Sequence, residues 1–192
     1  MKFKSVVFTG AIIGAITFAA GCAKQEEKEA PYIGVQGSWQ SNCVSGESAA
    51  LLGPSDLGIT QHSELKITKA EVIETSYVSS SECDGKDIEV ISTGRYHAVG
   101  NGLQIEDITY HVKPLTEFGL RVLRIAQWCG ISDWSLKESR DVTSEAGKEK
   151  CFSSRQATAQ ISIGESDMKV KESDRMQSSF YGMKSGLYFK RR

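Results

Sequence analysis

Hydrophobic and polar residues alternate with a period of two over most of the chain beyond residue 60. Many of the positions involved carry β-branched or aromatic side chains, which favour strands. The predicted strands are residues 64–68, 72–78, 88–91, 93–99, 103–112, 120–128, 157–163, 168–170 and 187–190. We therefore predict a domain built from strands, each with one apolar face.

Turn-forming residues separate several of these runs. Asp84-Gly85, Gly100-Asn101-Gly102 and the segment 164–167 each stand between two predicted strands. Such residues supply the positive φ or the side-chain caps that tight turns need. Residues 33–192 are accordingly expected to form a single all-β domain, an antiparallel up-and-down meander closed as a barrel or sandwich. A short helix is expected at most within 45–60 or 141–151.

Two connections are longer than a hairpin turn. Residues 44–62 are predicted to form a polar loop that includes His62. The loop also contains several aliphatic residues, so it is able to act as an apolar flap over an opening. These aliphatic residues are Leu51, Leu52, Leu57 and Ile59. Residues 129–151 form a polar excursion that begins and ends in cysteine, which indicates a stapled loop.

The N-terminus has the pattern of an export signal. Lys2 and Lys4 precede a run without charge from Val6 to Ala20. The run is shorter than the roughly 20 apolar residues that a membrane-spanning helix needs. Residues 1–21 are therefore expected to be a signal peptide and not a transmembrane segment.

The end of this run, Ala19-Ala20-Gly21-Cys22, resembles the lipobox of bacterial lipoproteins. The resemblance implies cleavage before Cys22 and attachment of a diacylglyceryl group, with fatty acyl chains such as palmitate, to its sulfur. Residue 23 is Ala, whereas Asp at that place commonly marks inner-membrane retention in the Gram-negative family, so the outer membrane is the expected location. Residues 22–32 are polar and are expected to form a flexible tether. The alternative is an ordinary cleaved signal with Cys22 near the cut by chance.

Four cysteines remain in the mature domain: Cys43, Cys83, Cys129 and Cys151. An oxidising compartment makes two disulfides the expected state, and three connectivities are open. We favour the sequential pairing, Cys43 with Cys83 and Cys129 with Cys151, because it joins near neighbours in the chain. A metal site that combines cysteines with histidines is not expected, because the spacings lack the short paired intervals of zinc sites. The histidines are His62, His97 and His111, and we interpret them as ordinary half-buried or surface residues.

The stretch "QGSWQSNC", residues 36–43, contains Gly37-x-Trp39 just before the meander. It resembles the Gly-x-Trp of lipocalins and the wider calycin group, and this resemblance implies an eight- to nine-stranded lipocalin-like barrel. In that group the tryptophan closes the base of the barrel and a basic residue of the last strand lies across the indole. Here Arg191, or else Lys190, is able to take that place.

Composition and motifs narrow the functional classes. The chain has 23 basic and 24 acidic residues, and no basic patch supports nucleic-acid binding. No motif of a hydrolase, zinc protease or phosphate-binding loop is present, and Glu106-Asp107 is expected to point to opposite faces of a strand. We therefore expect neither an enzyme nor a cofactor.

Two functional hypotheses remain. The first is a membrane-anchored barrel that binds a small apolar ligand, such as a lipid. The second is a surface or envelope lipoprotein that acts through protein contacts, in adhesion, inhibition of a host factor or envelope maintenance. Trp128 and Trp134 flank Cys129. We favour packing on the disulfide over lining a ligand opening for both tryptophans.

Overall fold

A computed structural model describes residues 34–45, 59–80, 83–99, 102–148, 151–152, 154–172 and 187–192. Several sequence predictions fall outside these residues. They are the signal peptide 1–21, the tether 22–32 with Cys22, and the flap residues Leu51, Leu52 and Leu57.

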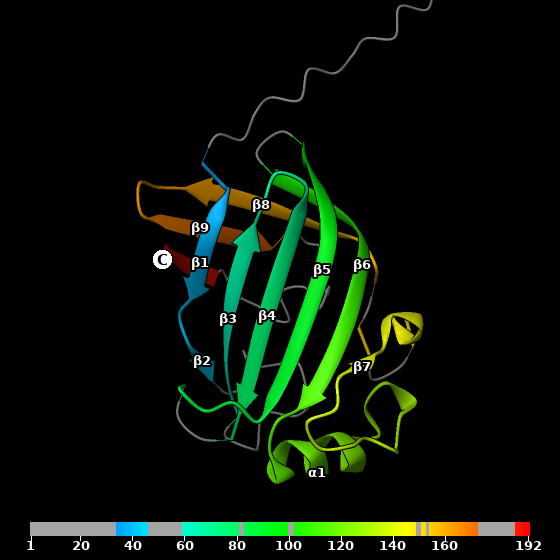
Figure 1. Ribbon diagram of the computed structural model, residues 1–192. Helices are drawn as coiled ribbons and strands as arrows, with labels where there is room; N and C mark the ends of the chain where they lie inside the picture. Colours follow the sequence, from blue (N-terminus) through cyan, green and yellow to red (C-terminus); the bar gives the residue numbers. More distant parts are fainter. Residues whose placement is uncertain are drawn as a thin grey trace, which may run out of the picture.

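The described residues form ten strands, one α-helix and two short 3₁₀ helices, and every strand pairing is antiparallel (Figure 1). The strands are β1 (Gly37–Ser41), β2 (Val44–Ser45), β3 (Thr60–Ile67), β4 (Glu71–Ser79), β5 (Ile88–Val99), β6 (Gly102–Pro114), β7 (Arg140–Asp141), β8 (Ala157–Ile163), β9 (Asp167–Glu172) and β10 (Leu187–Arg191).

Strand β1 closes the sheet on itself. It pairs with β3 through Trp39 opposite Leu65 and with β10 through Trp39 opposite Arg191. The other neighbours follow chain order from β3 to β6 and then from β8 to β10, while β2 and β7 are short additions to β3 and β6. The predicted fold class is confirmed: the domain is an all-β, antiparallel, up-and-down meander of the lipocalin-like type.

The segment predicted as a strand over 120–128 is instead helical. Helix α1 spans Glu117–Ala126, and the 3₁₀ helix η4 follows at Trp128–Gly130. Two aliphatic residues that are three positions apart, Leu120 and Leu123, share the buried face of α1, which is helical spacing. The prediction was wrong because Leu120-Arg121-Val122 alternates locally like a strand. The start of the helix is set by the N-cap Thr116, whose side chain accepts from the backbone N–H of Gly119. None of the helices in the described part of the chain is long and apolar enough to cross a bilayer.

The excursion between β6 and β8 completes the barrel wall. β8 pairs with β6 only from Gly102 to Ile105, so the rest of β6 needs other partners. These come from β7 and from the loop backbone: the N–H of Ile108 donates to the carbonyl of Arg155, and the N–H of Val142 donates to that of Tyr110. Figure 1 shows α1 below the ends of β4, β5 and β6. The second 3₁₀ helix, η5 (Thr143–Glu145), lies within the range 141–151 where a short helix was expected.

A β-bulge in β6 overturns one prediction about acidic residues. The register between β5 and β6 shifts after Thr93, and Asp107 adopts φ +53°. As a result, both acids of the pair Glu106-Asp107 face outward: Asp107 contacts Arg95, and Glu106 lies 3.7 Å from His97. The prediction that these carboxylates point to opposite faces was wrong because a bulge adds one residue to the alternation.

Candidate functional site

The residues of the lipocalin resemblance meet at one end of the barrel. The guanidinium carbon of Arg191 lies 4.9 Å from the centre of the Trp39 ring, and Arg191 also donates to the carbonyl of Gly34 at 2.7 Å. The indole N–H of Trp39 donates to the carbonyl of Val35 at 2.9 Å. Gly37 adopts φ +143°, a backbone conformation that other residues rarely adopt. These contacts tie the first strand, the last strand and the preceding turn together, and the basic residue over the indole is Arg191.

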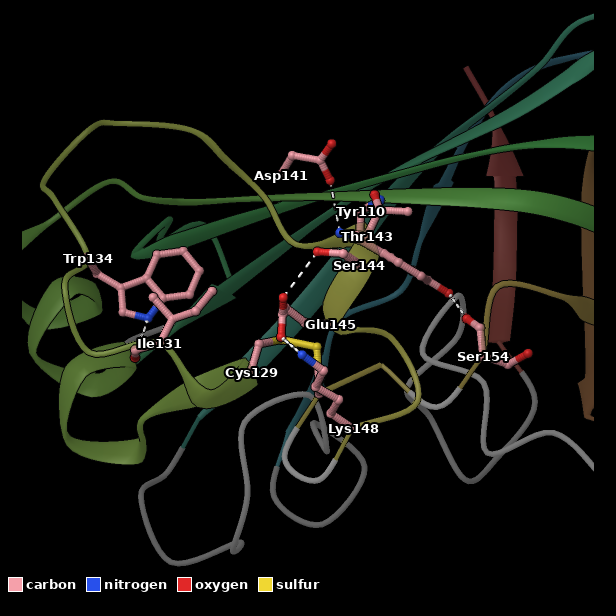
Figure 2. The surroundings of a disulfide bond; sticks show 11 residues. Tyr110, Cys129, Ile131, Trp134, Asp141, Thr143, Ser144, Glu145, Lys148 and Ser154 are labelled. Carbon is pink, nitrogen blue, oxygen red and sulfur yellow. Dashed lines mark hydrogen bonds and ion pairs between the residues drawn. A yellow bond between two sulfur atoms is a disulfide. The ribbon is translucent and has the colours of Figure 1, made fainter.

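The four cysteines form two disulfides with the sequential connectivity. Cys43 is bonded to Cys83 across a Cα–Cα distance of 5.7 Å, and Cys129 is bonded to Cys151 across 4.4 Å. The first disulfide joins the end of β1 to the turn between β4 and β5. The second staples the excursion between β6 and β8 (Figure 2). In the chain-entropy account, each contributes about 3–4 kcal/mol to stability.

The tryptophans beside Cys129 belong to the core of the excursion. Trp128 packs edge-on against Phe152 at 5.0 Å. Figure 2 shows the Trp134 indole, which donates to the carbonyl of Ile131 at 3.0 Å. Tyr110 stacks on Phe152 at 3.9 Å, and its hydroxyl donates to the carbonyl of Ser154. This aromatic group fills the space behind the second half of β6. Both tryptophans are buried and pack within the excursion.

Polar side chains interrupt the inner face of the barrel on β3 and β4. Alternation from Leu65 places Ser63 and Gln61 on the inner face of β3, and alternation from Val72 places Glu74 and Ser76 on that of β4. All four are buried. The expectation of one wholly apolar face per strand is wrong for these two strands. We refer to Gln61, Ser63, Glu74 and Ser76 as the inner polar cluster.

Three members of the inner polar cluster are joined by hydrogen bonds. The hydroxyls of Ser63 and Ser76 lie 2.7 Å apart, and Ser76 donates to the Glu74 carboxyl at 3.2 Å. Ser63 is placed by its own backbone as well, because its N–H donates to the hydroxyl of Ser41 on β1 at 2.8 Å. Burial raises the pKa of Glu74 to about 8, although the hydrogen bonds with Ser63 and Ser76 oppose the shift. Glu74 is therefore mainly a neutral carboxylic acid at pH 7.

Gln61 is the exception within the cluster. The residue is 1% exposed, yet among the described residues neither its amide nitrogen nor its amide oxygen has a hydrogen-bond partner. Leaving such groups unpaired costs on the order of 1–3 kcal/mol each. Gln61 stands opposite Val78 on β4 and Val44 on β2, so the side chains directly across from it offer no polar atom. A buried amide with two open hydrogen-bonding groups requires a partner outside the described residues, such as water or a ligand.

Among the residues that the structure describes, no buried lysine or arginine accompanies the cluster. Among the described residues, the buried polar and charged side chains are Ser41, Gln61, His62, Ser63, Glu74, Ser76, Ser79 and Ser92. His62 belongs to β3 and not to a polar loop as predicted, and it faces the outer side, 5.1 Å from the Tyr77 ring. Its burial and nearby Lys86 lower its pKa. The inner polar cluster thus suits an uncharged hydrogen-bonding group, and a protonated Glu74 is a poor base for activating Ser76.

A second candidate lies on the outer surface of the excursion. Asp133, Trp134, Ser135, Glu138, Ser139 and Arg140 line a groove of about 340 Å³. Arg140 pairs with Asp133 at 2.7 Å, so the one basic side chain of the groove lining is already engaged, and Glu138 is a further acidic residue there. No buried polar atom of the groove is left without a partner, in contrast to Gln61. The barrel interior is therefore the stronger candidate.

The sequence contained a usable signal for the inner polar cluster. Counting in steps of two backward from Ile67 and Leu65 reaches Ser63 and Gln61, and counting forward from Val72 reaches Glu74 and Ser76. From the sequence, these stretches were predicted only to be strands. The polarity of their buried face becomes visible once β3 and β4 are paired in register.

Comparisons with known proteins add no family assignment. The chain matches no protein-family model, and a search of curated proteins finds no match. Within the described ranges, no group of three or more His, Cys, Asp or Glu residues is arranged to hold a metal ion. The site must therefore be interpreted from its own chemistry.

Proposed function

We propose that this protein is a lipid-anchored, lipocalin-like binding protein of the cell envelope that holds a small, mainly apolar ligand inside its barrel. The single observation that carries the proposal is the side-chain amide of Gln61, which is buried on the inner face of β3 with both polar atoms unpaired. A bound molecule that satisfies this amide removes the cost of its burial.

The rest of the inner face supports an apolar body for the ligand. Leu65 and Ile67 follow the cluster along β3, and Val72 and Val78 flank it on β4. Val90 continues the same surface on β5, since it pairs with Ser76. Contact with such a surface favours hydrocarbon by about 25 cal/mol per Å² of apolar area removed from water. A ligand with a hydrocarbon body and one polar group matches both parts of the interior.

Native mass spectrometry of the full-length protein tests ligand binding. Protein released from membranes in a mild detergent is expected to carry a small molecule of defined mass, which is lost on unfolding. Cross-linking in intact cells tests the alternative in parallel. If the protein carries no small molecule and cross-links to one envelope or host protein, the proposal is contradicted and action through protein contacts is favoured.

Anchoring is proposed separately, on the sequence around Cys22. A diacylglyceryl group on this residue would hold the domain at the outer membrane of a Gram-negative cell through the tether 22–32. Replacing Cys22→Ala removes the acceptor sulfur and is expected to release the protein from the membrane fraction, as judged by fractionation and by loss of fatty-acid labelling. A protein that stays in the membrane fraction after this replacement would count against lipid anchoring.

A further inference from the structure

We infer that the ligand of the barrel carries an uncharged amide group, which pairs with the side-chain amide of Gln61. This inference rests on the proposed function and adds the chemical class of the polar group. The inner polar cluster leaves one amide with open hydrogen-bonding capacity, and this capacity sets the class.

Gln61 offers a donor and an acceptor side by side. Its Nε2 carries two N–H groups, its Oε1 carries two lone pairs, and neither atom has a partner within the described ranges. A ligand amide presents the same pair in reverse, so that two amides join through two parallel N–H···O bonds. An alcohol has one hydrogen to donate and meets this arrangement less completely.

Charged groups fit the site less well. A carboxylate has only acceptors and would leave Oε1 of Gln61 unpaired, and among the described buried residues no lysine or arginine is present to balance its charge. An ammonium has only donors and would leave Nε2 unpaired. A carboxylic acid matches the pattern when protonated, but its ordinary pKa is near 4–5, so keeping it neutral in the interior at pH 7 costs free energy that an amide does not spend.

The other members of the inner polar cluster already have hydrogen-bond partners of their own. The hydroxyls of Ser63 and Ser76 are bonded to each other, and Ser76 also bonds Glu74. Because these groups satisfy one another, they compete little for the amide of Gln61. In the cluster, the two serines and Glu74 therefore satisfy one another, and only the amide of Gln61 is left open to a ligand.

A series of eight-carbon compounds tests the inference. Octanamide, 1-octanol, octanoate and octylamine share one hydrocarbon chain and differ only at the head group. Their affinities for the full-length protein at pH 7 are measured by isothermal titration calorimetry in one detergent buffer. Octanamide is expected to bind about tenfold more tightly than octanoate or octylamine, which corresponds to about 1.4 kcal/mol. A preference for octanoate or octylamine overturns the inference.

Comparing variants of the protein in the same buffer cancels the partitioning of each compound into detergent, because that partitioning does not depend on the variant. Gln61→Leu keeps the size of the side chain and removes both polar atoms, so octanamide binding is expected to weaken about tenfold while 1-octanol changes little. Gln61→Met provides a second test, because its unbranched side chain of similar length also removes both polar atoms. Gln104→Leu is the control, since Gln104 lies on β6 between the inward-facing Leu103 and Ile105 and bonds Glu106 outside.

The outcomes separate this inference from the proposed function. Unchanged octanamide binding in Gln61→Leu means that water satisfies the amide, and the inference falls. If native mass spectrometry identifies a bound molecule without an amide, ligand binding stands and the inference falls. If no compound binds and no molecule accompanies the protein, the proposed function and the inference fall together.

Discussion

Thr116 donates its hydroxyl hydrogen to the carboxylate of Asp87 at 2.5 Å, across 29 positions of the chain. The same hydroxyl oxygen accepts the backbone N–H of Gly119 and so caps α1. Asp87 also accepts the N–H of Ser80, and its backbone carbonyl accepts that of Leu115. Burial acts to raise the pKa of Asp87, but the hydrogen bonds from Thr116 and Ser80 hold it below its usual value. The Asp87 side chain thus joins the end of β4 to the start of α1.

Replacing Thr116→Val tests this junction. The valine keeps the shape of the side chain but loses both hydrogen bonds, and the free energy of unfolding is expected to fall by about 1–2 kcal/mol. Thr116→Ser retains the hydroxyl and should stay within about 0.5 kcal/mol of the native protein. Urea unfolding followed by circular dichroism at pH 7 measures both. Equal losses in the two variants would show that the hydroxyl is not what matters.

Gly119 allows α1 to approach the sheet. A Cβ atom at this position would lie 2.1 Å from the carbonyl oxygen of Asp87, a backbone atom that cannot rotate away. Gly119→Ala is therefore expected to displace the helix and cost about 3 kcal/mol. Gly130→Ala is the comparison, because Gly130 has φ +72° with no atom within 4 Å of the added carbon, and strain alone should cost about 1–2 kcal/mol. Thermal unfolding of both variants decides whether the close approach dominates.

The contact of Arg191 with Trp39 predicts a difference between neighbouring basic residues. Arg191→Met removes the cation over the indole and the hydrogen bonds to Gly34 and Gln36. The expected loss of stability is about 1–2 kcal/mol. Lys190→Met is the matched control: Lys190 is an exposed neighbour, and its replacement should change stability by less than about 0.5 kcal/mol. Similar losses in both variants would contradict the assignment of Arg191 to this contact.

The raised pKa of Glu74 predicts a pH dependence of stability. Between the ordinary pKa of 4.5 and the folded-state pKa of about 8, the folded protein holds a proton that the unfolded chain has released. This contribution is fully present below pH 4.5 and is lost as the pH rises toward 8, at up to about 1.4 kcal/mol per pH unit. Glu74→Gln removes the titration while keeping a neutral polar group. Subtracting its stability curve from that of the native protein between pH 5 and 9 isolates the effect, and a flat difference would contradict it.

The unpaired amide of Gln61 predicts that its loss stabilises the empty protein. Gln61→Leu replaces two unsatisfied polar atoms by hydrocarbon, so the free energy of unfolding without ligand should rise by about 1–2 kcal/mol. Gln104→Leu removes an outward amide that already has a partner and should give no such gain. Denaturant titration of both variants in the absence of ligand provides the measurement. A destabilised Gln61→Leu variant would mean that the amide is satisfied in the folded protein.

The features that the sequence predicted correctly are those that depend on residues close together in the chain. The period-two pattern and the turn residues predicted β4, β5 and β6 closely, because alternation reports directly which side of a strand is buried. The sequential disulfides agree with their short separations of 40 and 22 residues. In contrast, α1 was missed because three residues of local alternation resemble a strand, and only docking against Asp87 and Ile88 decides between the two.

The sequence by itself determined the meander, because each strand and turn depends on residues that are close together in the chain. Only the tertiary structure decided how the meander closes, through β1 pairing with both β3 and β10, and which side chains face the enclosed space. Gln61 and Glu74 are unremarkable polar residues in a list of strand positions. Once β3 and β4 pair, the amide of Gln61 is buried without a partner among the described residues, and the carboxylic acid of Glu74 keeps its proton. Local sequence does not predict either property, because the cost of burying a polar group depends on all the segments around it.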